Sequence, residues 1–179
     1  AALTAFSALN GFAQQTDKVF LSGQDFEHPV HWDFYCTDGN NSKTWSKINV
    51  PSQWELEGFG EYTYGRWYKE LNQKEPSKEE GLYKYEFEIP ADYKDKDILI
   101  AFGGAMTDTE VKVNGKLAGE IHQGGFYEFK YDITSLLNFG GKNTLEVHVW
   151  KHSANPTVNA AERRADWWLF GGIYRPVWL

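Results

Sequence analysis

Several features are scarce or missing in this 179-residue chain, and each absence narrows what it can be. Cys36 is the only cysteine, which rules out an internal disulfide and any metal site built from Cys-x-x-Cys pairs. There is no internal repeat or heptad run, and 17% of the residues are aromatic, so a collagen-like, coiled-coil or wholly disordered chain is excluded. Basic residues are also few, with 18 Lys and Arg against 25 Asp and Glu and a formal charge of −7. A chain this acidic lacks the basic face that nucleic acid or an anionic membrane requires, so neither is expected as a partner.

Recognisable catalytic motifs are missing as well. The sequence has no His-Glu-x-x-His, Gly-x-Ser-x-Gly or phosphate-loop pattern, and its five histidines do not cluster at ligand spacing. A glycosidase needs two carboxylates that flank the scissile bond, but spacing alone selects no pair among 25 acidic residues. We therefore predict no catalytic residue in this chain. The eight Trp and ten Tyr point instead to a neutral ligand such as a sugar.

The N-terminal segment predicts export. Residues 1–13 are apolar, uncharged and rich in small residues, and they are too short to span a bilayer as a helix. They are typical of the remnant of a secretory signal peptide, with cleavage after Ala13 exposing Gln14. The alternative is an ordinary first strand or core helix. Because an exported protein without disulfides suits a bacterial periplasm, we expect a periplasmic or secreted bacterial protein. Residues 14–30 would then form an N-terminal arm and residues 31–179 the folded domain.

Apolar and polar side chains alternate along much of the remaining chain, which predicts strands. Asn114-Gly115 lies between Val111 and Val113 on one side and Leu117 on the other, and predicts a tight hairpin. Pro176 places the last strand at a sheet edge, and residues 132–137 suit one helical turn. The fold class expected is an all-β sandwich. Its strands are predicted over 81–89, 98–102 (buried on both sides), 110–121 (the hairpin), 129–133, 145–150 and 174–179.

Two long segments, 55–76 and 151–172, do not read as strands and are rich in aromatic residues. Loops of this length inside a compact domain are usually functional or interfacial. Asp166 is the acidic residue that we single out, because it precedes Trp167 and Trp168 and a Gly-Gly turn. Its carboxylate could accept sugar hydroxyls or bind a hard cation, and the two indoles could stack on a pyranose. The alternatives are a carboxylate that caps backbone amides or pairs with an arginine, and indoles that fill a core or an interdomain seam.

The end of the chain, RADWWLFGGIYRPVWL at 164–179, resembles the closing segment of the N-terminal domain of family 2 glycoside hydrolases. This family includes β-galactosidase, β-glucuronidase and β-mannosidase. Weaker matches precede it in the family's order, so that the resemblance covers roughly residues 30–179. They are INVPSQW at 48–54, GLYKY at 81–85, VNGKLAG at 113–119, FKYDITSL at 129–136 and NTLEVHV at 143–149.

The resemblance implies a galactose-binding-like jelly-roll sandwich, the sugar-binding domain that precedes an immunoglobulin-like domain and a catalytic barrel. The family's catalytic glutamates lie on that barrel. In the β-galactosidase branch, the Asp at the position of Asp166 contacts the sugar and helps to hold a sodium ion. The branch also has a sugar-contacting Asn before the G-x-Y strand, whereas this chain has Ser77-Lys78-Glu79-Glu80 and no Asn there. That departure puts a strict β-galactosidase assignment in doubt. Arg164 and Arg175 are predicted to be structural, with Arg175 meeting a carboxylate across the sheet.

Three functions remain open at this point. The first is the sugar-binding domain of an exported, β-galactosidase-like family 2 hydrolase. In it Asp166, Trp167 and Trp168 bind the β-glycoside substrate, Asp166 contributes to a sodium site, and the following domains of the same chain are the partners. The second is a stand-alone carbohydrate-binding module. The third is a structural spacer in which the same residues only pack against the next domain.

Overall fold

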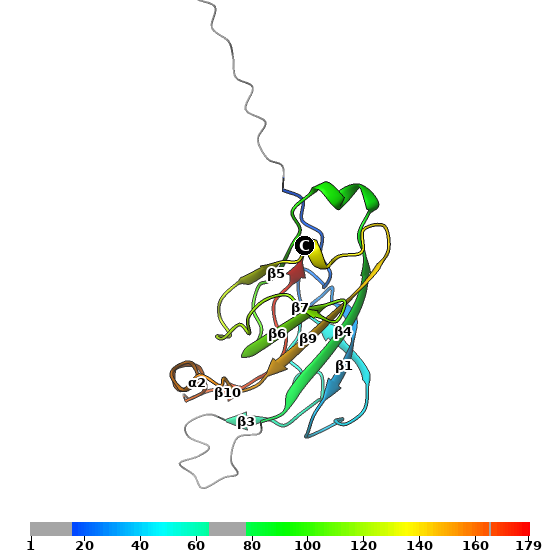
Figure 1. The fold of residues 1–179 in the computed structure, drawn as a ribbon. Coiled ribbons are helices and arrows are strands. Elements are labelled where there is room, and N and C mark those ends of the chain that lie inside the picture. Colours follow the sequence, from blue (N-terminus) through cyan, green and yellow to red (C-terminus); the bar gives the residue numbers. More distant parts are fainter. Residues whose placement is uncertain (1–15, 65–77, 165) are drawn as a thin grey trace, which may run out of the picture.

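The computed structural model describes residues 16–64, 78–164 and 166–179, which form a two-layer sandwich of antiparallel strands (Figure 1). The larger layer has six strands in the order β2-β1-β4-β9-β6-β7, and the smaller layer has the order β11-β5-β8. A further pair, β10 and β3, forms a separate two-stranded ribbon. The strands of the larger layer are β1 (Val30–Cys36), β2 (Ser46–Val50), β4 (Glu80–Glu88), β6 (Asp108–Val113), β7 (Lys116–Leu117) and β9 (Lys142–Trp150). The others are β3 (Thr63–Tyr64), β5 (Leu99–Phe102), β8 (Phe129–Asp132), β10 (Trp168–Leu169) and β11 (Val177–Trp178).

The core lies between the two layers and follows from the period-two alternation of the strands. Along β9, Leu145, Val147 and Val149 are buried, whereas the residues between them are partly exposed. They belong to one apolar cluster with side chains of the smaller layer such as Phe102 and Phe129, whose rings stack at 4.9 Å. The expectation of an all-β jelly-roll sandwich is therefore confirmed.

The predicted turn chemistry is also confirmed. Asn114 and Gly115 have φ angles of 52° and 76° and connect β6 to β7 in a hairpin. The turn predicted over 132–137 is the 3-10 helix η2 (Thr134–Leu136), where the Asp132 carboxylate accepts the N–H of Thr134 at 3.0 Å. Among the named strands β11 pairs only with β5, but its other side bonds to residues 19–21, so the edge position predicted from Pro176 holds for the named strands and not for a free edge.

Two expectations about elements were wrong in part. The prediction that residues 98–102 are buried on both sides fails at Leu99, which is 42% exposed. The segment 151–172 is not a loop throughout, because it contains the helix α2 (Pro156–Arg163) as well as β10. α2 begins where the Asn155 side chain accepts the N–H groups of Thr157 and Val158, and Pro156 occupies the first turn. The Asn-Pro pair was the sequence signal for this helix. Sequence analysis also assigned no element to residues 30–36, which form β1.

The elements outside the main layers have distinct places. The helix α2 and the ribbon of β10 and β3 lie at one end of the sandwich, and the C-terminus lies toward the other (Figure 1). Residues 19–21 of the predicted N-terminal arm hydrogen-bond with residues 177–179 and so extend the edge at β11. A second 3-10 helix, η1 (Ala91–Asp95), connects β4 and β5. No helix in the described part of the chain has the length and hydropathy needed to cross a membrane. Residues 1–13, which carry the signal-peptide prediction, lie outside the described residues.

Candidate functional site

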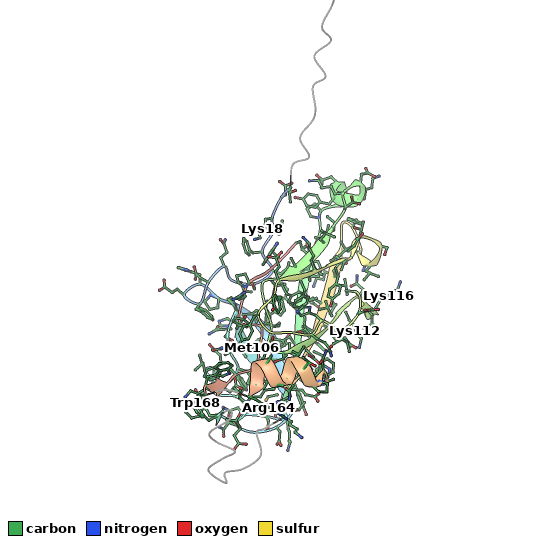
Figure 2. The ribbon with its side chains drawn as sticks, turned by 90° about the vertical axis from the view of Figure 1, so that its left-hand side faces the viewer. Lys18, Met106, Lys112, Lys116, Arg164 and Trp168 are labelled. Carbon is green, nitrogen blue, oxygen red and sulfur yellow. The ribbon has the colours of Figure 1, made fainter. Side chains whose placement is uncertain are left out.

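Trp168 lies on the surface at the end of the sandwich that carries α2 (Figure 2), and the exposed residues Asp166 and Trp167 directly precede it in the chain. Asp166 is exposed, and the two indoles are 45% and 50% exposed. The chain places these residues here because Trp168 and Leu169 pair with Tyr64 and Thr63 in the β10–β3 ribbon. The three residues singled out from the sequence are therefore adjacent and accessible, whereas a core position would have excluded any ligand role. Their ligand roles stay predictions.

The Trp168 indole is held by aromatic neighbours while half of it faces solvent. The ring of Tyr64 meets it edge-to-face at a centroid distance of 5.1 Å, and the ring of Tyr62 does so at 5.9 Å. Edge-to-face pairs of this kind add about 0.5–1.5 kcal/mol each beyond the area that they bury. The Trp168 face is thus presented in a fixed orientation.

Asp166 itself is tied through its main chain. The Tyr64 hydroxyl donates to the Asp166 carbonyl oxygen at 2.9 Å, and burial together with the negative charge of Asp166 raises the pKa of Tyr64. Within the described residues, no backbone amide and no arginine contacts the Asp166 carboxylate.

A groove of about 300 Å³ opens beside the two indoles. Its walls are mostly apolar, but the last turn of α2 contributes two buried charged side chains, Glu162 and Arg163. The Trp167 Nε1 donates to the Glu162 carbonyl oxygen at 3.3 Å, which connects this indole to the end of the helix. The groove is lined by Met106, Phe126, Glu162, Arg163, Trp167, Trp168 and Phe170.

The Arg163 guanidinium is directed into the protein. Its Nε donates to the Thr107 hydroxyl at 2.8 Å, its Nη2 contacts the same oxygen, and its Nη1 donates to the Phe170 carbonyl at 2.9 Å. Burial lowers the pKa of Arg163 to about 10, so the group is still charged at neutral pH. These bonds fix the chain on the C-terminal side of the two tryptophans to the strand region at Thr107.

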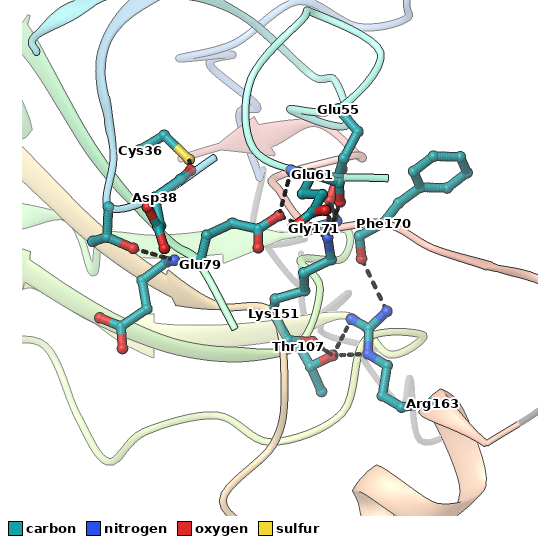
Figure 3. A network of polar contacts seen from close by, with 12 residues as sticks. Cys36, Asp38, Glu55, Glu61, Glu79, Thr107, Lys151, Arg163, Phe170 and Gly171 are labelled. Atoms are coloured by element: carbon teal, nitrogen blue, oxygen red, sulfur yellow. Dashed lines mark hydrogen bonds and ion pairs between the residues drawn. The ribbon is translucent and has the colours of Figure 1, made fainter. Parts of the chain in front are cut away.

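A buried charge cluster lies next to Gly171, the first residue of the Gly171-Gly172 turn (Figure 3). The Lys151 ammonium is within 2.7 Å of carboxylate oxygens of both Glu55 and Glu79, and all three side chains are 0% exposed. Lys151 Nζ also donates to the Glu61 carbonyl oxygen at 2.8 Å, and the Glu79 carboxylate accepts the Glu61 N–H at 3.0 Å. We call Glu55, Lys151 and Glu79 the buried triad. It connects the end of β9, the start of β4 and the segment before β3.

The Gly171-Gly172 turn is anchored to this triad. The Glu55 carboxylate accepts the Gly171 N–H at 3.0 and 3.2 Å, and the Trp54 N–H donates to the Gly171 carbonyl at 3.1 Å. A Cβ on Gly171 would lie 2.1 Å from the Trp54 ring, so only glycine fits there. Gly172 has a φ of 119°, as the predicted sharp turn requires. The exposed acid and indoles are consequently attached to a rigid base.

Other sequence-predicted residues behave differently. Arg175 donates to the carbonyl oxygens of Gly103 and Phe126 at 3.2 and 3.3 Å, so the expected carboxylate partner was wrong, because backbone oxygens occupy that position. Arg164 is exposed. Sequence reasoning did not find the buried triad, Glu162 or Arg163. Glu55 follows the INVPSQW match directly, but no local pattern marks Lys151 as buried.

Comparison with known proteins identifies the family of this β-sandwich domain. The sequence profile described as "Glycosyl hydrolases family 2, sugar binding domain" matches residues 22–179. The chain therefore belongs to glycoside hydrolase family 2, as its sugar-binding domain.

The curated relatives reported next are named β-galactosidases. The chain is 31% identical over 186 residues to a β-galactosidase of Streptococcus thermophilus, covering 96% of this chain and 16% of that protein. It is 38% identical over 98 residues to a β-galactosidase of Thermoanaerobacter pseudethanolicus, covering 54% of this chain and 13% of the relative. The chain thus spans less than a fifth of the length of each of these relatives.

Among solved structures, a β-glucuronidase of Bacteroides uniformis aligns with a TM-score of 0.60 at 27% identity, covering 90% of this chain and 18% of that one. A β-D-glucuronidase of Dictyoglomus thermophilum aligns with a TM-score of 0.62 at 21% identity, covering 93% and 28%. At that lower identity the likeness establishes the fold.

The buried triad predicts a large effect of removing its cation. Lys151→Met would remove the ammonium that lies between the buried Glu55 and Glu79 carboxylates, and we expect a loss of about 3–5 kcal/mol in the free energy of unfolding. The matched control is Lys84→Met, which removes a surface ion pair with Glu146 at 3.2 Å and is expected to cost about 1 kcal/mol or less. Urea denaturation of both variants measures the difference. Equal effects would show that the triad has no special weight.

The triad also predicts a pH dependence. Desolvation raises the pKa of Glu55 above its ordinary value of 4.5, against the opposing effects of Lys151 and the Gly171 N–H. A carboxyl group whose pKa is raised on folding stabilises the fold at low pH and loses that contribution as pH rises through the raised value. The stability of the wild type relative to Glu55→Gln should therefore decrease from pH 4.5 upward. Denaturation curves across this range test the sign, and a relative stability that increases with pH would refute it.

Proposed function

We propose that this chain is the accessory domain of an exported, β-galactosidase-like glycoside hydrolase and completes the glycan pocket of that enzyme. Asp166, Trp167 and Trp168 are the residues that we propose to meet the substrate. The observation that carries this proposal is that the exposed acid and indoles lead into the Gly171-Gly172 turn, whose Gly171 N–H is held by the Glu55 carboxylate of the buried triad. A surface that binds sugar needs such a combination of rigid aromatic faces and a hydrogen-bond acceptor.

The chemistry divides between this domain and the rest of the enzyme. Asp166 would accept hydroxyl hydrogens of a pyranose, while the indoles of Trp167 and Trp168 would cover its apolar face. We assign no bond-breaking role to this chain, and the acid/base and nucleophile carboxylates would come from the following domains. Those domains would also cover the end of the sandwich that carries α2, so that the domain braces the catalytic barrel.

The sodium ion expected at Asp166 finds only a partial set of ligands here. A sodium or other hard cation takes about six oxygen ligands. The described residues contain no group of three or more His, Cys, Asp or Glu that could hold a metal. Asp166 would supply one carboxylate, and the remaining ligands would have to come from other domains. We therefore derive no step of the function through a metal ion.

Export and substrate follow from different observations. The apolar, small-residue segment 1–13 supports a secreted or periplasmic enzyme. The names of the relatives, which include β-galactosidase and β-glucuronidase, support a β-linked pyranoside as substrate. A stand-alone binding module is not favoured, because the relatives named here are enzymes of much greater length.

The proposal predicts the effect of removing the Asp166 carboxylate in the full-length enzyme. Asp166→Ala should lower kcat/KM for a β-galactoside tenfold or more, equivalent to about 1.4 kcal/mol of transition-state stabilisation. Its matched control is Asp97→Ala, an exposed aspartate just after η1, which should leave the kinetics unchanged. Steady-state kinetics with a chromogenic galactoside provide the measurement. If both variants match the wild type, the turn is only an interdomain spacer.

A further inference from the structure

Glu162 is a buried acid with one unused oxygen at the groove. The residue is only 9% exposed, and its Oε2 accepts the Gly125 N–H at 2.9 Å. Its Oε1 makes no hydrogen bond or ion pair within the described residues, although the side chain lines the groove. This oxygen is not one of the fully enclosed side-chain atoms, so solvent reaches it and a ligand hydroxyl can take the place of water as its donor.

Neither neighbouring arginine, Arg163 or Arg164, donates a hydrogen bond to the Glu162 Oε1 within the described residues. Arg163 is committed to Thr107 and to the Phe170 carbonyl, as described above. Arg164 is exposed and does not line the groove. The groove therefore presents a carboxylate acceptor among its lining residues, while the Arg163 guanidinium donates to Thr107 and Phe170.

The walls of the groove suit the apolar face of a ring. Trp167 is fixed to the end of α2, Trp168 is fixed by the tyrosines of the β3 segment, and Phe126, which is 48% exposed, also lines the groove. The volume of about 300 Å³ lies at the lower end of the range typical of small-molecule sites, and is enough for a single sugar ring. Aromatic walls with one acceptor match an uncharged ring that carries hydroxyl groups.

We propose that this groove binds a neutral pyranose of the substrate and that Glu162 is its specificity-determining residue. The Glu162 Oε1 would accept a sugar hydroxyl, and the carboxylate would repel the carboxylate of a uronic acid placed at the same position. This inference rests on the proposed function, because it assumes that the groove opens into the glycan pocket. It selects neutral glycosides over uronides, two substrate classes that the names of the relatives leave open.

The test compares two substrates that differ only at C6, p-nitrophenyl β-D-galactoside and p-nitrophenyl β-D-galacturonide, on the full-length enzyme. The wild type should prefer the galactoside. Glu162→Gln keeps a carbonyl oxygen for the Gly125 N–H but replaces the unused acceptor with a neutral amide. We expect the ratio of kcat/KM values, galactoside over galacturonide, to fall about tenfold, with a higher KM for the galactoside. The matched control is Glu128→Gln. Glu128 is an exposed glutamate three residues after Gly125 and does not line the groove, so this variant should leave the ratio unchanged.

The outcomes separate this inference from the proposed function. The inference is overturned if the wild type prefers the galacturonide. It is also overturned if the galactoside-to-galacturonide ratio of Glu162→Gln equals that of the wild type, as it would if side chains of another domain filled the groove. If Asp166→Ala still lowers activity in that case, the proposed function stands alone. If Glu162→Gln is unstable in a thermal melt, Phe126→Ala replaces it as the test variant, because it removes an exposed aromatic side chain that lines the groove. A raised KM for the galactoside then supports the inference, and an unchanged KM overturns it.

Discussion

One ammonium group enclosed between two carboxylates determines how the end of this sandwich is arranged. Lys151 directly follows Trp150, the last residue of β9, and its ammonium contacts Glu55 and Glu79, which come from different segments of the chain. Burying three charges is expensive, and such clusters are tolerated only where the geometry and the additional hydrogen bonds are good. Here the carboxylates also accept the N–H groups of Glu61 and Gly171. The cluster therefore fixes relative positions more than it adds to net stability.

The consequence of this constraint appears on the surface. Because Gly171 is bound to Glu55 and packed against Trp54, the chain that leads into the closing turn has little freedom. Asp166 and the two indoles can then be exposed without being loose. Rigid presentation of a partial site avoids the cost of ordering side chains when a ligand or a neighbouring domain arrives. A domain that contributes only part of a pocket benefits from this arrangement.

The strands with clear alternation and the Asn114-Gly115 hairpin were predictable from sequence, because period-two burial and positive φ angles are local properties. The sequence also singled out Asp166, Trp167 and Trp168 as candidate site residues, partly through the closing segment that resembles family 2 hydrolases, and all three are exposed. α2 was missed although Asn155-Pro156 is a helix-start signal, since the aromatic and glycine content of the surrounding segment dominated the interpretation. The buried triad was not predictable, because Lys151 reads as an ordinary charged residue until β4 and β9 are paired. Glu162 was missed for the same reason, as its burial depends on tertiary contacts.

The most direct test of this account is the amide hydrogen-exchange rate of Gly171, measured by NMR under native conditions. If the buried triad fixes the closing turn, this amide should exchange only through global unfolding, with a protection free energy equal to that of core amides in β4 and β9. Exchange at the rate of an exposed loop amide would show that the turn opens independently of the core, and would contradict the account.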